Sequence, residues 1–234
     1  MAGKGFTFKQ FEINHEACAM KVGTDGVLLG AWCACSSARR IADIGTGTGL
    51  IALMCAQRNA DAEIDAIDID HSAVECAREN VARSAWSGRI RVIESAVQDY
   101  TCEERYDLIV SNPPYFSETL QSPDPSRAVA RHNCSLPHRD LIDAAKRLLT
   151  TEGRLALILP ADEARRFAMQ AVAAGLHLRR RCDVATKPGA VPKRTMSEWS
   201  LTNGEAEIEL LTLSADDGQR SEQYRRLTEE FYLH

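Results

Sequence analysis

The sequence lacks several features that mark whole classes of protein. It has no apolar run approaching the roughly 18 residues of a membrane helix. Its first residues, MAGKGFTFKQF, lack the long apolar segment of a signal peptide, so we expect a cytoplasmic protein. It also lacks internal repeats and low-complexity tracts. We therefore expect one domain over residues 1–234, with residues 1–39 as an N-terminal extension and residues 40–234 as the core.

Cysteines at the spacing of a metal site are also missing. The eight cysteines are scattered, and the one close pair, Cys33 and Cys35, has no second pair or histidine partner at zinc-site spacing. We therefore expect reduced, buried thiols and no bound metal.

Positive charge is scarce in the chain as a whole. There are 28 Lys and Arg against 33 Asp and Glu, which gives a formal net charge of -5 and argues against a nucleic-acid partner. The distribution is uneven, however, because residues 116–200 carry 14 basic and 9 acidic side chains while the rest carries 14 and 24. RNA could bind this basic half, although a solvated surface accounts for the same charges.

The stretch YDLIVSNPPY, from Tyr106 to Tyr115, has the pattern of a buried strand that ends at a rigid turn. Pro113 and Pro114 restrict the backbone directly after Asn112. In open α/β sheets, ligands bind beyond the carboxyl ends of the strands. Asn112 is therefore a candidate site residue, although Asn-Pro-Pro alone is a common turn.

A second strand and turn precede it at RIADIGTGTG, which is followed by a predicted helix over Leu50–Gln57. Glycines at alternate positions let the backbone approach a ligand closely at the helix N-terminus. Their spacing differs from the G-x-G-x-x-G of dinucleotide sites, and Asp43 stands at the strand end. A carboxylate there would repel a pyrophosphate but could accept a hydrogen bond from an ammonium group.

Two further acidic positions belong to this pattern. The predicted strand EIDAIDID ends at Asp68, 19 residues past Gly49, where an acidic side chain accepts hydrogen bonds from ribose hydroxyls. Asp70 is the expected N-cap of the next helix. Upstream, Thr24 and Asp25 precede an apolar turn, either as the cap of a short helix or as part of a loop that closes over a ligand.

The remaining elements follow from periodicity. Residues 6–13 alternate as in a short hairpin, and strands are expected at residues 90–95, 154–160, 176–184, 195–202 and 207–213. A helix marked by Leu141 and Ala145 is expected to end at Gly153, and another to end at Gly175. A last helix should bury Tyr224 and Phe231.

Taken together, these motifs resemble those of class I S-adenosylmethionine-dependent methyltransferases that act on amino groups. The segments GFTFKQF, AMKVGTDGVLLGAW, DIGTGTGL, NPPY and EEFYLH resemble, more narrowly, the tRNA(Val) (adenine-37-N6)-methyltransferase family. The resemblance implies an α/β, Rossmann-like fold with a mostly parallel seven-stranded sheet, helices on both faces and an antiparallel C-terminal strand pair. It also implies S-adenosyl-L-methionine as methyl donor and the N6 amine of an adenine in tRNA as acceptor.

The resemblance further implies how the cofactor is held. The family would place its ribose at Asp68, its amino group near Asp43, and its methionine part and surroundings at Thr24, Asp25, Gly45, Gly47, Gly49 and Asn112. One position departs from the family pattern. Such enzymes usually have an Asp after the strand at residues 90–95 to bind the cofactor adenine, but this chain has Ala96 and Val97. Either Asp99 or backbone groups would replace it.

The same resemblance gives the catalytic turn its expected chemistry. An adenine amine is a poor nucleophile, so its lone pair must be oriented and the charge developing on nitrogen stabilised. The Asn112 oxygen and the Pro113 carbonyl would accept its two hydrogens, with Pro114 completing the turn, and Tyr115 would stack on the base. No strong base is required.

An RNA substrate would meet the basic half of the chain. The long loop at residues 116–135 is a candidate substrate lid, with Arg131 as a possible phosphate contact and His132 beside it as a surface residue. The two C-terminal strands and their connection carry the other candidate RNA-binding residues, which are Arg179, Arg180, Arg181, Lys187, Lys193 and Arg194. A charged sheet edge that resists strand addition is the alternative explanation for them.

Other functions remain open at this point. A protein glutamine and guanine in ribosomal RNA also present a planar NH2 to such a turn. The roughly 40 residues before the first core strand are too few for the helical N-terminal domain usual in glutamine methyltransferases. An RNA-binding module without catalysis is the non-enzymatic alternative, which the intact Asp43, Asp68 and Asn112 oppose; an NAD-dependent oxidoreductase conflicts with the glycine spacing. We expect a monomer without an obligate protein partner.

Overall fold

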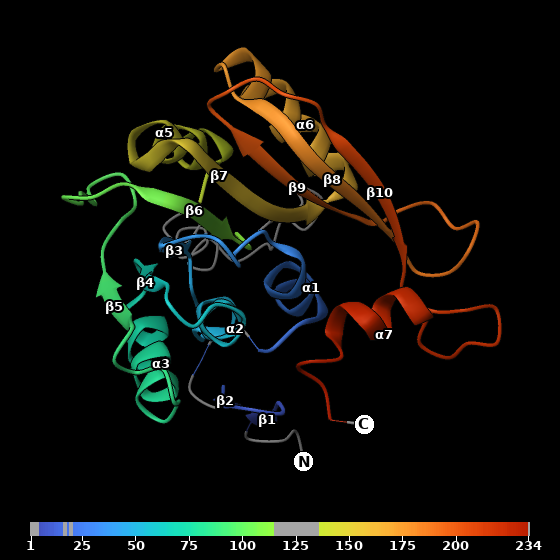
Figure 1. Ribbon diagram of the computed structural model, residues 1–234, viewed down its shortest axis with the longest axis horizontal. Coiled ribbons are helices and arrows are strands. Elements are labelled where there is room, and N and C mark those ends of the chain that lie inside the picture. Colours follow the sequence, from blue (N-terminus) through green and yellow to red (C-terminus); the bar gives the residue numbers. More distant parts are fainter. Residues whose placement is uncertain (1–4, 16–17, 19–20, 115–135, 234) are drawn as a thin grey trace, which may run out of the picture.

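The computed structural model describes residues 5–15, 18, 21–114 and 136–233 (Figure 1). The predicted stacking residue Tyr115, the loop at 116–135, and Arg131 with His132 lie outside these residues. Within the described parts of the chain, no helix combines the length and the apolar composition that crossing a membrane requires.

An eight-stranded sheet forms the centre of the molecule. In spatial order its strands are β10 (Glu207–Thr212), β8 (His177–Ala185), β9 (Arg194–Ser200), β7 (Leu149–Pro160), β6 (Tyr106–Ser111), β3 (Arg40–Ile44), β4 (Glu63–Asp68) and β5 (Ile90–Glu94). Strands β3 to β7 run parallel, whereas β9 runs antiparallel to both β7 and β8. The expected Rossmann-like sheet with its antiparallel pair is confirmed. In the described structure the sheet has eight strands, whereas seven were expected. The additional strand is β10, which pairs in parallel with β8 at the edge of the sheet.

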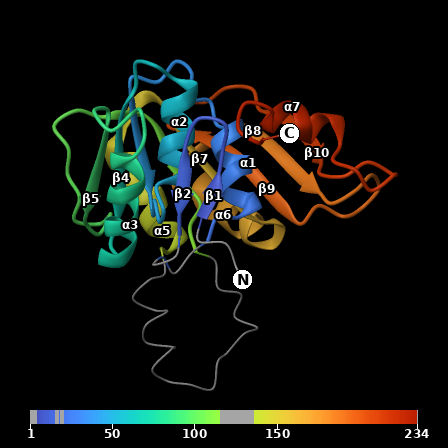
Figure 2. The ribbon, with the colours of Figure 1, turned by 90° about the horizontal axis from the view of Figure 1, so that it is seen from below.

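Helices cover both faces of this sheet (Figure 1). One face carries α1 (Thr24–Trp32), α2 (Leu50–Arg58), α3 (His71–Ala82) and α7 (Glu222–Thr228), and the other carries α5 (His138–Leu148) and α6 (Ala161–Ala173). Each face has its own hydrophobic core, with Leu53 in one and Phe167 in the other. Figure 2 shows α1, α2 and α3 in front of the sheet, beside the small antiparallel hairpin of β1 (Gly5–Thr7) and β2 (Glu12–Asn14).

The sequence pattern explains why each element adopts its structure. Strand β7 is covered by helices on both faces, so its residues 155–159 (LALIL) are apolar without interruption and at most 1% exposed. Helix α5 instead packs one face, and its buried Leu141, Ala145 and Leu148 recur at three- and four-residue spacing. Asp70 caps α3 as expected, since its side chain accepts a hydrogen bond from the Ser72 nitrogen.

The expected end of α5 at Gly153 is wrong. The helix ends at Leu148, and β7 begins at Leu149. Pairing with β6 then shifts between Tyr106 and Leu108, so that Gly153 lies in an irregular part of the ladder. A Cβ added to Gly153 would lie 2.8 Å from the carbonyl oxygen of Tyr106, so this glycine permits a close backbone approach instead of ending a helix. The expected helix end at Gly175 is confirmed, because α6 ends at Ala173 and Gly175 follows with a φ angle of 87°.

Two other expectations also need correction. The first turn of α1 has Gly23 as N-cap without a side-chain hydrogen bond, so neither Thr24 nor Asp25 caps it. The structure also joins Cys18 and Cys76 in a disulfide, with their Cα atoms 6.3 Å apart, so free thiols were the wrong expectation for this pair. The end of β2 packs on α3, where Asn14 and Asn80 exchange hydrogen bonds, and this packing brings Cys18 close to Cys76.

Candidate active site

A cavity of about 500 Å³ opens beyond the carboxyl ends of β3 and β6, next to the first turn of α1. Strand β3 pairs with both β4 and β6, which places the cavity where the strand order reverses, the usual ligand position in such sheets. Seven of the predicted catalytic and cofactor-binding residues line it, namely Thr24, Asp25, Gly45, Gly47, Asn112, Pro113 and Pro114. Segments far apart in the sequence therefore meet here, as the strand ends predicted.

The loop after β3 owes its shape to its glycines. Gly45, Gly47 and Gly49 have φ angles of 71°, 57° and 79°, a region that residues with a side chain adopt only with strain. The backbone nitrogens of Gly45 and Thr46 both donate to the carbonyl of Ile67, at 2.8 and 3.1 Å. A Cβ built on Gly47 would meet no described atom within 4 Å. The loop thus turns its backbone toward open space in the cavity.

Asp68 fixes this loop from the end of β4. One carboxylate oxygen accepts from the Gly47 nitrogen at 2.9 Å, and the other from the Asp70 nitrogen at 3.0 Å. Burial raises the pKa of this carboxyl above its usual value. A carboxylate oxygen can accept more than one hydrogen bond, so acceptor positions remain for ribose hydroxyls. The ribose contact itself stays a prediction.

Asp43 lies beneath the loop and is fully buried. Its Oδ2 accepts from the Thr46 hydroxyl at 2.6 Å and from the Ala52 nitrogen at 3.1 Å, whereas its buried Oδ1 has no hydrogen-bond partner in the described structure. Burial raises the pKa of Asp43 to about 7, although these two donors oppose the shift. A cation close to Oδ1 would supply the missing partner and favour the ionised carboxylate.

The turn after β6 is held against the same loop. The Ser111 hydroxyl donates to the carbonyl of Ile44 at 2.8 Å, which joins the last residues of β6 and β3. Asn112 follows directly, and its Oδ1 is buried without a partner among the described residues. A Cβ on Gly26 would lie 3.8 Å from Asn112 Nδ2, so the first turn of α1 packs closely over the amide.

The two prolines separate this cavity from a smaller one of about 220 Å³. Pro113 and Pro114 line both, and the smaller cavity is completed by the two residues before α5 and by residues of α5, β7 and α6. Among them, His138 Nε2 lies 3.7 Å from a carboxylate oxygen of Glu163. Burial lowers the pKa of His138 despite this neighbour. The two prolines therefore border both cavities, whereas Asn112 lines only the larger one, beside the glycine loop.

Arg194 lies where sequence reasoning did not place it. We expected an RNA contact at this residue, but its Nε lies 2.7 Å from Asp25 Oδ2 in the wall of the larger cavity. The two residues are 169 positions apart, and no local pattern links them. Thr46 and Thr48 were also missed as lining residues, although their positions between the glycines could have indicated them.

Ala96 and Val97, the expected adenine contacts, begin a turn after β5. The Ala96 carbonyl accepts from the nitrogens of Asp99 and Tyr100, at 3.1 and 3.0 Å, and Val97 is buried. Neither residue lines the larger cavity among the residues described, and Asp99 is exposed. Their contact with the cofactor adenine stays a prediction.

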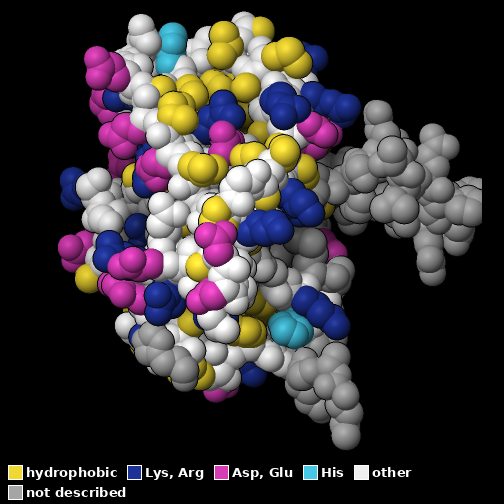
Figure 3. Space-filling view, turned by 90° about the vertical axis from the view of Figure 1, so that its right-hand side faces the viewer, with side chains coloured by type: hydrophobic (Ala, Val, Ile, Leu, Met, Phe, Trp, Pro, Cys, Tyr) yellow, Lys and Arg dark blue, Asp and Glu magenta, His cyan; other side chains and the backbone are white. Residues whose placement is uncertain are grey.

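The basic residues of β8 and β9 differ in their surroundings. Arg180 binds Glu209 at 2.6 Å and lies 4.3 Å over the Trp32 ring, and Arg181 binds Asp183 at 2.6 Å. Figure 3 shows this side of the molecule, where basic and acidic side chains are interspersed. The exposed side chains Lys187 and Lys193 lie on the connection between the two strands. An RNA contact stays a prediction for the whole set.

Known proteins resemble the chain over most of its length. The methyltransferase small domain family matches residues 23–178. The tRNA1(Val) (adenine(37)-N6)-methyltransferase of Bacteroides thetaiotaomicron is 49% identical over 100% of this chain and 99% of its own. The protein of the same name from Tolumonas auensis is 46% identical over 100% and 98%. A solved structure described as a predicted O-methyltransferase from Agrobacterium tumefaciens superposes with a TM-score of 0.66 at 21% identity, over 88% of this chain and 96% of its own.

The structural likeness shows that the fold is that of a class I methyltransferase. The family match spans both the glycine loop and the turn at Asn112, and the relatives extend it across the C-terminal strands. The chain therefore belongs to the methyltransferase small domain family and to the family of the tRNA1(Val) (adenine(37)-N6)-methyltransferases.

Proposed function

We propose that this protein transfers a methyl group from S-adenosylmethionine to the N6 amine of an adenine in tRNA, at nucleotide 37 of a valine tRNA. The observation that carries the proposal is the buried Asn112 oxygen, which lacks a described partner and belongs to the lining of the larger cavity, next to Pro113. The shared name of the full-length relatives supports the choice of acceptor.

The larger cavity fits the cofactor. Its volume of about 500 Å³ is within the range usual for small-molecule sites. The glycine loop leaves open space where a side chain would otherwise stand, and the Asp43 Oδ1 is a buried acceptor suited to an ammonium group. When bound, S-adenosylmethionine supplies an electrophilic methyl group on a sulfonium cation. Asp68 would bind its ribose, and Thr24 with Asp25 would lie beside it.

Asn112 and Pro113 would orient the acceptor. The side-chain oxygen of Asn112 and the backbone carbonyl of Pro113 accept the two amine hydrogens, which aims the nitrogen lone pair away from both. As positive charge develops on the nitrogen, these hydrogen bonds strengthen. The proton leaves readily once the nitrogen is methylated, so the site needs no strong base. Pro114 holds the turn, and Tyr115 would stack on the base.

The substrate would approach across the exposed lysines of the strand connection. Lys187 and Lys193 would contact the tRNA backbone, together with Arg131 and the arginines of β8. We propose that the protein acts as a monomer in the cytoplasm, where such a substrate is found. The smaller cavity, which Pro113 and Pro114 also line, would receive part of the flipped nucleotide.

The test is methylation of unmodified valine tRNA transcripts, with nucleoside analysis by mass spectrometry. We expect N6-methyladenosine in a transcript with adenine at nucleotide 37 and none when guanine replaces it. If the transcript with guanine at nucleotide 37 is methylated to the same extent, the methylated nucleotide is not nucleotide 37. Cofactor binding without any product in tRNA would instead favour a protein glutamine or ribosomal RNA acceptor.

A further inference from the structure

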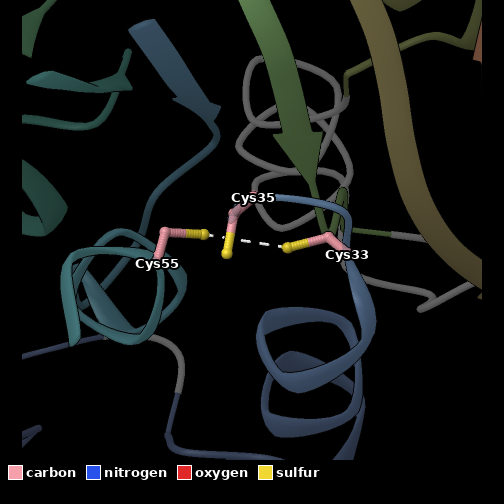
Figure 4. Close-up of side chains that lie close together, drawn as sticks. All are labelled: Cys33, Cys35 and Cys55. Carbon is pink, nitrogen blue, oxygen red and sulfur yellow. Dashed lines mark hydrogen bonds between the residues drawn. The ribbon is translucent and has the colours of Figure 1, made fainter. Parts of the chain in front are cut away.

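Three cysteine side chains converge between α1 and α2, away from both cavities. Cys33 stands at the end of α1, Cys35 follows it, and Cys55 lies on α2 (Figure 4). All three are fully buried, and their sulfur atoms lie within 4.8 Å of one another. Figure 4 shows the three side chains pointing toward a common centre. The Cys33 and Cys55 sulfurs are 3.8 Å apart.

The backbone that carries two of these thiols is firmly held. Asn59 Nδ2 donates to the carbonyls of Cys35 and Ala38, at 2.7 and 2.8 Å. The Ala34 nitrogen donates to the buried carboxylate of Glu198 at 2.8 Å. Glu198 is itself paired with Arg154, at 2.9 Å, so its charge is compensated. The thiols therefore lie on a fixed turn, as the ligands of a metal site do.

A positive charge stands beside the sulfurs. Arg58 follows Cys55 by three residues on α2, and its Nη1 donates to the carbonyls of Gly30 and Cys33, at 2.9 and 2.7 Å. The same nitrogen lies 3.7 Å from the Cys33 sulfur. Buried charges must be balanced locally. Three thiolates, one divalent cation and this guanidinium sum to zero charge.

We propose that Cys33, Cys35 and Cys55 form a binding site for a thiophilic divalent metal ion such as Zn²⁺. A metal–sulfur distance of about 2.3 Å places sulfur ligands about 3.8 to 4.0 Å apart. The Cys33–Cys55 distance already meets this value, and the Cys35 sulfur lies at most 4.8 Å from either of them, no more than about 1 Å beyond it. Soft thiolate ligands select such ions over magnesium or calcium.

The site would clamp two helices that both reach the active site. The first turn of α1 and the start of α2 line the larger cavity, whereas none of the three cysteines does among the described residues. Metal binding would therefore stabilise the arrangement of these helices without touching the reacting groups. Because the sulfurs are buried, the ion would enter while the chain folds or opens locally.

The test starts from the full chain, unfolded under reducing conditions with a chelator and refolded with Cd²⁺ or Zn²⁺. We expect one ion per chain, an ultraviolet sulfur-to-cadmium charge-transfer band and a higher Tm than in metal-free buffer. Cys33→Ser, Cys35→Ser and Cys55→Ser should each weaken binding at least tenfold. Cys182→Ser, a buried free cysteine elsewhere, and Cys18→Ser should leave it unchanged.

Two outcomes would overturn the proposal. Wild-type protein that refolds, as judged by circular dichroism, yet retains no ion after gel filtration would show that the thiols only fill the core. Binding that survives Cys55→Ser but is lost in Cys18→Ser would place the ion elsewhere. Because the wild-type stoichiometry and the two control variants do not depend on the cluster variants folding, the proposal stays testable if one of those variants fails to fold.

Discussion

The hydroxyl of Ser111 donates a hydrogen bond of 2.8 Å to the carbonyl oxygen of Ile44. Ser111 is the last residue of β6, and Ile44 is the last residue of β3. The contact thus joins the strand that leads to Asn112 with the strand that leads to the glycine loop. The contact therefore holds the turn at Asn112, the proposed acceptor site, against the glycine loop of the proposed cofactor cavity.

Replacing Ser111 with alanine should disturb both stability and turnover. The variant leaves the buried Ile44 carbonyl without this donor, which costs about 1 to 3 kcal/mol in the free energy of unfolding. Because the turn also loses its anchor, we expect kcat to fall more than cofactor affinity does. Urea unfolding and methyl-transfer kinetics measure the two effects. Ser84→Ala is the matched control, since its hydroxyl bonds the Val81 carbonyl at the end of α3 and should leave kcat unchanged.

Asp43 should make the ligand-free protein less stable as pH rises. Its pKa is raised by burial to about 7 in the folded protein, against about 3.8 in the unfolded chain. The folded state therefore binds the proton more tightly, and the resulting stability is full below pH 4 and lost as pH rises to about 7. We expect Asp43→Asn to flatten this part of the pH profile of unfolding. A wild-type profile that rises between pH 4 and 7 relative to the variant would contradict the raised pKa.

Neighbouring residues of the strand connection should separate RNA binding from cofactor binding. Lys193 is exposed, whereas Arg194 is paired with Asp25 in the cavity wall. Lys193→Glu should weaken tRNA binding and reduce its salt dependence, with cofactor affinity unchanged. Arg194→Ala should weaken cofactor binding, because the ion pair that holds Asp25 in the cavity wall is lost. Calorimetry with cofactor and filter binding with tRNA at several salt concentrations test both, and identical behaviour of the two variants would refute the distinction.

Local patterns in the sequence predicted the elements that carry the site. The run at residues 108–110, the prolines after Asn112 and the alternating glycines each determine backbone structure over a few residues, so their positions were readable. The irregular strand pairing at Gly153 could not be predicted from the sequence. Leu141, Ala145 and Leu148 continue a helical pattern up to the strand that follows, so the sequence shows no sign of where the helix ends.

Contacts between distant residues were equally hidden. Arg194 meets Asp25 only because β9 inserts beside β7, and Cys55 meets Cys33 and Cys35 only because α1 packs on α2. The pair Cys33 and Cys35 did not indicate a metal site in the sequence, because the third cysteine of the cluster, Cys55, lies 20 residues after Cys35. The burial of a residue also could not be predicted from its amino-acid type alone. Asp43 is an acidic residue at the end of a strand, yet it lies fully buried beneath the glycine loop.

The most direct measurement compares wild type with Asn112→Ala in methyl transfer from S-adenosylmethionine to valine tRNA, with cofactor affinity measured by calorimetry on the same preparations. The account predicts that N6-methyladenosine forms with wild type and that kcat falls by about 100- to 1,000-fold in the variant, because a buried acceptor for the amine is lost. Cofactor affinity should fall far less than kcat does, since the account assigns the lost oxygen mainly to the acceptor amine. Wild-type turnover in Asn112→Ala at normal cofactor affinity would contradict the central role given to this side chain.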